Sequence, residues 1–173
     1  MSTMKIIQDD NLKALLILID LLPTSNACIR GGKGGKGGKV KSSKNLRKEP
    51  VKITPQKCML EFVSSIESIQ NFSEEKRLRM GTPVQPYIVA IDGRTTQFQV
   101  QGDGCIIARK PSNEIITTFH LLFKMYYVFN LTYPILLQNF YLFMQVNVYG
   151  IQDKCPESVS SLYTALKFCR RSG

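Results

Sequence analysis

The sequence predicts an α+β fold in which a small antiparallel meander of three strands packs against a buried helical hairpin, with additional short helices. Residues 115–152 carry a single formal charge, at Lys124, in an otherwise apolar and aromatic stretch, which indicates a core. Residues 86–109 change to short β-branched runs separated by glycine turns, the pattern of a meander. A chain of 173 residues is long enough for one domain with a core and short for two.

The chain divides into three predicted segments: an N-terminal amphipathic helix in residues 1–29, a flexible basic linker in residues 30–50, and an α+β domain in residues 51–173. The helix is expected over residues 10–22, with Asp10 or Asn11 as its N-cap and Pro23 at its end. Its polar side lacks the basic residues of a membrane-surface helix, so docking on the protein's own core is favoured. One face collects the apolar side chains Leu12, Leu15, Leu16, Ile19 and Leu22.

The linker contains a repeated Gly-Gly-Lys unit and no acidic residue up to position 48, although the whole chain has a formal charge of +10. Glycine is costly to order and like charges repel, so we expect disorder in isolation. Such a tract could neutralise nucleic-acid phosphates without reading sequence, and it resembles a nuclear-import signal. A solvated spacer is the alternative. The candidate nucleic-acid-binding residues are Arg30, Lys33, Lys36, Lys39, Lys41, Lys44, Arg47 and Lys48.

Helical signals open the third segment. Thr54 followed by Pro55 is a typical helix start, and a short charged helix is expected over residues 73–79. The three strands follow, over residues 86–92, 97–101 and 105–109. Glutamines alternate with apolar residues in the middle strand, which predicts that one of its faces meets water. The core-facing stripe of the first helix would comprise Met59, Phe62, Val63, Ile66 and Ile69.

The predicted hairpin begins with a helix over residues 115–129 that is apolar most of the way round, and therefore buried. The chain turns at residues 130–134, and a second helix follows. Each run is at or below the ~20 residues of a membrane span, so packing on the sheet is favoured over membrane insertion. A last helix starts at Pro156, with Val159, Leu162, Leu166 and Cys169 expected to face inward.

Catalytic and metal-binding patterns are not evident. His120 is the only histidine, its nearest acid in sequence lies six residues away, and a packed core histidine is the favoured interpretation. Asp92 and Asp103 each precede glycine, which indicates turns rather than metal ligands. Cys105 has no activating neighbour. We therefore expect no enzyme activity, no cofactor and no metal.

The cysteines and the N-terminus indicate a reducing compartment, either the nucleus or the cytoplasm. Five cysteines are an odd number, and no two of them stand at CxxC spacing, so free thiols are favoured over disulfides. The aliphatic run at residues 15–22 is preceded and interrupted by aspartates, unlike a secretory signal.

Several stretches are similar to one known group of proteins. They are ALLILIDLLP (residues 14–23), the Gly/Lys tract, QPYIVA (85–90), LFKMYYVFNLTYP (122–134) and FMQVNVYGI (143–151). In this order they resemble the C-terminal module of a family of repetitive vertebrate proteins, abundant in fish, that are often labelled as similar to sterile-alpha-motif proteins. The resemblance implies a shared fold, carries no catalytic residues over, and suggests an association with mobile elements.

These observations lead to two functional hypotheses. The first is a non-enzymatic protein-interaction module that binds a protein partner or itself, with the basic tract adding loose nucleic-acid affinity. The alternative is a nucleic-acid-binding accessory protein, derived from a mobile element, in which the tract is the main contact surface.

Overall fold

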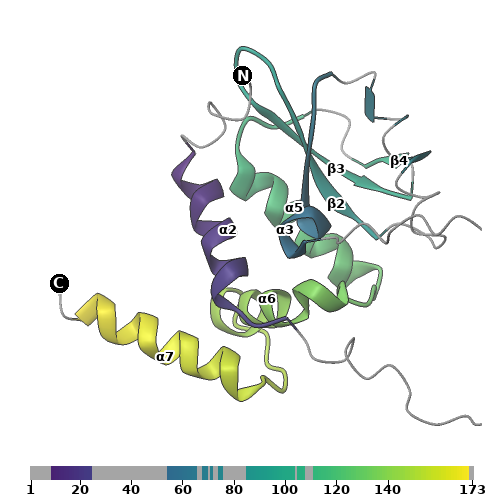
Figure 1. Ribbon diagram of the computed structural model, residues 1–173. Coiled ribbons are helices and arrows are strands. Elements are labelled where there is room, and N and C mark those ends of the chain that lie inside the picture. The colour runs from purple at the N-terminus through teal and green to yellow at the C-terminus, as the bar shows by residue number, and fades with distance from the viewer. Residues whose placement is uncertain are drawn as a thin grey trace, which may run out of the picture.

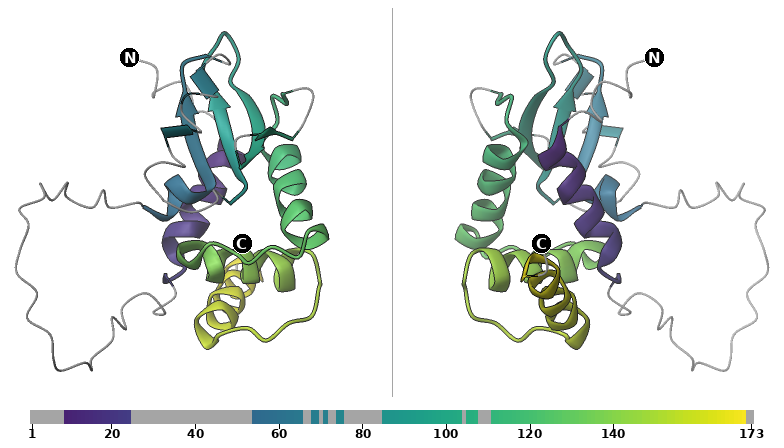
Figure 2. Two further views of the ribbon diagram at one scale, coloured as in Figure 1. Left: turned by 90° about the vertical axis from the view of Figure 1, so that its right-hand side faces the viewer. Right: turned by 90° about the vertical axis from the view of Figure 1, so that its left-hand side faces the viewer.

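The computed structural model describes residues 9–24, 54–65, 68–69, 71, 74–75, 85–103, 105–107 and 111–171. Within these residues a sheet lies at one end of the molecule and helices cover one of its faces and its lower end (Figures 1 and 2). The predicted α+β class is confirmed. The basic tract at residues 30–48 and the predicted charged helix at 73–79 lie outside, or almost wholly outside, the described residues.

The sheet has four strands and is mixed, which corrects the predicted sheet of three antiparallel strands. Its order is β1 (Leu60–Val63), β2 (Tyr87–Ile91), β3 (Gln97–Gly102) and β4 (Cys105–Ile106). Strands β2, β3 and β4 are neighbours and antiparallel, whereas β1 pairs in parallel with β2, with Leu60 opposite Ile88. Beyond β4, the N–H of Ile107 donates to the carbonyl of Val100 in β3, and Ser112 exchanges two backbone hydrogen bonds with Phe98.

Strand β1 interrupts the helix predicted from Pro55 onward. Helix α3 spans only Pro55–Met59, and Leu60 already has an extended backbone. The apolar residues at 59, 62, 63, 66 and 69 fit a helical spacing, but residues 60–63 find a hydrogen-bonding partner in β2, and pairing overrides local preference.

The two faces of the sheet contact different cores. The larger core contains Leu60, Ile88, Ala90, Phe98 and Val100 together with the helices. The smaller core contains Val63, Ile69, Tyr87, Val89 and Ile91 on the opposite face. The prediction that the β3 glutamines meet water is therefore wrong for two of the three. Gln99 and Gln101 are buried on the face of the smaller core, and the hydroxyl of Tyr87 donates a 3.3 Å hydrogen bond to Oε1 of Gln101.

Helix α2 (Asp10–Leu21) docks on the main core, as the sequence predicted. Its N-cap is Asp9, whose side chain accepts hydrogen bonds from the backbone N–H groups of Asn11 and Leu12. Leu12, Leu15 and Ile19 are buried beside α3 and α5. A hydrogen bond from Gln56 to Asp20 joins α3 to α2.

Helix α5 (Ile115–Val128) lies against β2 and β3, and the arm that follows it is broken into three short pieces. These are a 3-10 turn η2 (Ile135–Leu137), helix α6 (Gln138–Phe143) and a π-helical turn η3 (Met144–Val148). Aromatic rings join the two arms: Phe119 of α5 contacts Phe140 and Tyr141 of α6, at centroid distances of 5.6 and 6.2 Å. The expectation that α5 is buried holds for one part of its circumference, since Phe119, Leu122 and Tyr126 are buried whereas Ile116, Tyr127 and Val128 are exposed.

Helix α7 (Glu157–Arg171) lies on the side of the helical layer away from the sheet (Figures 1 and 2). Val159 is fully buried, Leu162 and Tyr163 are half-buried, and the ring of Tyr163 meets Phe143 edge-on. The predicted inward face does not continue, since Leu166 and Cys169 are exposed. Among the residues of α7 whose exposure is described, the buried and half-buried ones lie between residues 158 and 163.

Candidate functional site

The end of helix α5 presents a group of exposed apolar side chains. Tyr127, Val128 and Phe129 are 56%, 74% and 64% exposed, and they are consecutive. Leu131 and Ile135 in the following turn are 38% and 48% exposed. We call these five residues the apolar turn surface. Runs of exposed apolar residues are unfavourable in water, so in soluble proteins they are associated with function.

The backbone at the end of α5 fixes the direction of these side chains. Asn130 adopts a left-handed conformation with a φ of 48°, and its N–H donates to the carbonyl of Tyr127. The N–H of Leu131 donates to the carbonyl of Tyr126 at 2.9 Å. These two bonds form a Schellman motif, which ends a helix and leaves the next residue in contact with its last turn.

Side-chain contacts of Gln85 and Tyr133 also hold the turn in place. Nε2 of Gln85, just before β2, donates a 2.7 Å hydrogen bond to the carbonyl of Thr132. The ring of Tyr133 stacks on Tyr141 at a centroid distance of 4.7 Å, and its hydroxyl donates to Oε1 of Gln145 at 2.8 Å. Because both ends of the turn are anchored, the surface is pre-formed, and a partner would not have to order it on binding.

The surface lacks formal charge. Residues 125–152 contain no Asp, Glu, Lys, Arg or His, so the nearest charged side chain in the sequence is Lys124. An apolar surface without charged residues at its centre is typical of protein–protein contacts.

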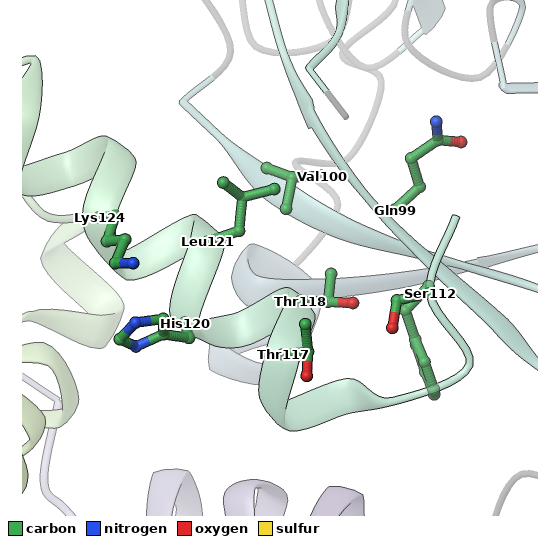
Figure 3. Close-up of a pocket in the computed structure, with 9 residues that line it drawn as sticks. Gln99, Val100, Ser112, Thr117, Thr118, His120, Leu121 and Lys124 are labelled. Carbon is green, nitrogen blue, oxygen red and sulfur yellow. The ribbon is translucent and has the colours of Figure 1, made fainter. Parts of the chain in front are cut away.

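A second candidate is a shallow pocket of about 310 Å³ between β3 and α5 (Figure 3). Val100 and Leu121 form its apolar floor, and Gln99 points to the other side of the strand. Polar groups lie along α5 and at Ser112. The hydroxyl of Thr117 donates to Oε2 of Glu114, and that of Thr118 donates to the carbonyl of Glu114. The protons of these two hydroxyls are already donated within the protein, and Lys124 and His120 are the basic side chains that line the pocket.

His120 lies at the edge of this pocket, and its exposure corrects the expectation of a core histidine. Its Nδ1 is 3.0 Å from the hydroxyl of Tyr149, and the two rings stack. Tyr149 is in turn stacked on Phe123 at 4.1 Å, and burial raises its pKa. Among the described residues, the hydrogen-bond neighbour of His120 is thus a phenol rather than the carboxylate that general acid–base catalysis commonly pairs with histidine.

The two Asp-Gly pairs lie where the sequence predicted turns. Asp103 is exposed between β3 and β4 with a φ of 47°, and Asp92 immediately follows β2. Among the described residues, no group of three or more His, Cys, Asp or Glu side chains is arranged to hold a metal ion. Within the ranges that the structure describes, no disulfide joins any of Cys58, Cys105, Cys155 and Cys169.

Comparisons with known proteins give no family for this chain: no protein-family model matches it, and no curated protein or solved structure is significantly similar to it. The described part of the chain holds no helix with the length and hydropathy of a membrane span. The eight basic residues from Arg30 to Lys48 lie outside the described residues, so their role stays a prediction, as does the resemblance to the repetitive vertebrate family.

The apolar turn surface was not predicted, because the aromatic residues of 115–152 were all expected in the core. Hydrophobicity gave no signal for it, because Leu121, Leu122 and Phe123 are also three consecutive large apolar residues of α5 and all of them pack on the main core.

Proposed function

We propose that this chain is a non-enzymatic protein-interaction module that binds a protein through the apolar turn surface. The observation that carries the proposal is the exposure of Tyr127, Val128 and Phe129 on a turn anchored by Gln85 and Tyr133. Burying such side chains is favourable by about 25 cal/mol per Å² of apolar surface, and pre-formed surfaces lose little of this to ordering.

The test compares wild type with Phe129→Lys and with a matched control, Ile17→Lys. Ile17 is 57% exposed on the outer side of α2, so both variants replace an exposed apolar residue by lysine. Lysine is also compatible with the last turn of a helix. Each protein is immobilised on a resin and incubated with nuclease-treated cell extract. We expect wild type and Ile17→Lys to retain the same bound proteins and Phe129→Lys to lose them. Equal retention by all three would contradict the proposal.

The basic tract supports a second role, as the contact surface for nucleic acid. Residues 30–48 carry eight positive charges and no acid, which is eight of the chain's ten net charges. In the alternative function, a nucleic-acid-binding accessory protein derived from a mobile element, this tract is the main functional surface. We propose it as the weaker candidate, since it rests on sequence alone.

The salt dependence of nucleic-acid binding tests whether the basic tract is the contact surface. If several of these side chains neutralise phosphates, a log–log plot of affinity against salt should have a slope of roughly −4 or steeper. Replacing all eight basic residues by Gln should abolish binding to DNA or RNA and leave the melting temperature unchanged. Binding that persists after this replacement would assign it to another surface.

A further inference from the structure

The pocket between β3 and α5 is lined on its helical side by one face of α5. Thr117, His120, Leu121 and Lys124 stand at helical spacing, so their side chains lie along a single stripe of the helix. Val100 of β3 lies across from this stripe and completes the apolar floor (Figure 3). A volume of about 310 Å³ is at the lower end of the range for small-molecule sites, so the pocket has room for a small ligand.

The two ends of the pocket differ in their polar groups. At one end the hydroxyl groups are paired within the protein: Thr117 donates to Oε2 of Glu114, and Ser112 accepts from the N–H of Glu114 at 3.0 Å. Figure 3 shows Lys124 and His120 at the other end of the floor. Within the described ranges, Nζ of Lys124 makes no ion pair and Nε2 of His120 makes no hydrogen bond. The side-chain donors open to a ligand therefore lie at this basic end.

Tyr149 holds the ring of His120 in place at the basic end. Its hydroxyl is 3.0 Å from Nδ1 of His120, and the two rings stack at a centroid distance of 5.5 Å. Tyr149 is itself stacked on Phe123 at 4.1 Å. When the phenol donates its proton to Nδ1, the imidazole carries its own proton on Nε2. This N–H is then a fixed donor beside the ammonium group of Lys124, four residues along the same face.

We propose that the pocket binds a small organic anion, a carboxylate held by Lys124 and His120, whose apolar tail of about six to eight carbons lies over Leu121 and Val100. The carboxylate of Glu114 belongs to the opposite end, about 15 Å along α5 from Lys124. It would repel a second negative group there, so a monoanion with an apolar tail fits better than a dianion with charges at both ends.

The expected affinity is modest because the pocket is shallow and both basic side chains are exposed. For a ligand of about ten non-hydrogen atoms we expect a dissociation constant on the order of 1 mM. The site shares no residue with the apolar turn surface, so it would add a ligand-binding function to the proposed protein contact.

NMR spectroscopy of the full chain tests the proposal. His120 is the only histidine in the sequence, so the resonance of its ring proton Hε1 has no counterpart from another histidine. Sodium octanoate is added to about 20 mM at constant pH and ionic strength, and we expect a saturable shift of this resonance. Affinity should fall about two- to fourfold for each methylene lost in hexanoate and butanoate, because less apolar surface is buried. 1-Hexanol, which lacks the charge, should bind about fivefold or more weakly than hexanoate.

Three variants locate the site. Lys124→Gln should weaken octanoate binding about fivefold or more, because the amide retains most of the side chain and removes its charge. Lys167→Gln removes an exposed lysine of α7, and Phe129→Lys alters the apolar turn surface. Both should leave octanoate binding unchanged. Near-ultraviolet circular dichroism checks that each variant is folded.

Several outcomes would overturn the proposal. One is the absence of a saturable shift with octanoate. Equal affinities for butanoate and octanoate would show an ionic contact without an apolar pocket. Binding that is unchanged in Lys124→Gln, or lost only in Phe129→Lys, would place the anion elsewhere on the protein. Each of these outcomes leaves the proposed protein contact standing, since retention of proteins from extract measures that contact separately.

Discussion

The hydroxyl of Tyr126 in α5 donates a 2.8 Å hydrogen bond to the carbonyl oxygen of Pro86, immediately before β2, and both residues are buried. This bond fixes the helix relative to the sheet at the end that carries the apolar turn surface. One residue away, Gln85 holds the turn itself through Thr132. The segment before β2 therefore positions both the last turn of α5 and the loop that follows it.

Removing the Tyr126 hydroxyl should destabilise the fold. Tyr126→Phe leaves the buried carbonyl of Pro86 without this donor, and an unsatisfied buried acceptor costs about 1–3 kcal/mol. Urea unfolding followed by circular dichroism measures the change in the free energy of unfolding. An unchanged midpoint would show that another donor, such as water, replaces the phenol.

Tyr141 provides the opposite case within the same aromatic cluster. Its ring is fully buried, and among the described residues its hydroxyl makes no hydrogen bond of good geometry, although it lies close enough to the Tyr126 hydroxyl for each group to shift the pKa of the other. Tyr141→Phe removes a desolvated polar group that is poorly compensated, so we expect stability to stay constant or to rise by about 1 kcal/mol. The same urea titration measures it. A loss as large as that of Tyr126→Phe would reveal a bond made by the Tyr141 hydroxyl.

These two phenols should also make the protein sensitive to alkali. Burial raises the pKa of Tyr126, and it raises the pKa of Tyr141 well above the ordinary range. Below about pH 10 both residues are protonated in the folded and unfolded chains alike. Above it the unfolded chain releases protons that the folded chain retains, so stability falls as the pH rises. The fall in unfolding free energy between about pH 8 and pH 11 should be smaller in Tyr141→Phe than in wild type. Equal falls would contradict this.

The left-handed residue at the end of α5 should tolerate glycine and not alanine. Asn130 has a φ of 48°, a conformation that glycine adopts without strain and that costs other L-residues roughly 1–2 kcal/mol. Thermal unfolding should therefore show Asn130→Gly equal to or more stable than wild type, by up to about 1 kcal/mol, and Asn130→Ala less stable. If both variants have the same melting temperature, the backbone conformation is not limiting.

Local signals predicted those elements whose stability depends on nearby residues. The aspartate and leucine pattern of α2 indicated a capped helix with one buried face, and Asp9 caps it one residue earlier than predicted. The run from Tyr87 to Ile91 and the turns at Asp92 and Asp103 were likewise recognisable. Helix caps, turns and the alternation of apolar and polar residues depend on residues that are close in sequence, so they can be recognised without knowing the fold.

Two assignments failed because a distant segment changed the environment of a correct local pattern. Residues 60–63 fit a helical pattern locally, but in the folded chain they pair in parallel with β2. Gln99 and Gln101 alternate like an exposed strand, yet the smaller core with Ile69 and Val89 covers their face. A face of a sheet meets water only if nothing else packs there, and sequence alternation does not report this.

The candidate site depended on the tertiary structure even more strongly. By itself the sequence determined that residues 115–152 are apolar and nearly uncharged, and that the basic charge is concentrated in a separate tract. Only the folded chain decided that Phe119 and Tyr141 lie inside whereas Val128 and Phe129 lie outside. The reason is geometric. A helix has side chains all round its circumference, and the sheet, helix α2 and the neighbouring arm cover only part of α5. Hydrophobicity does not specify which part remains exposed.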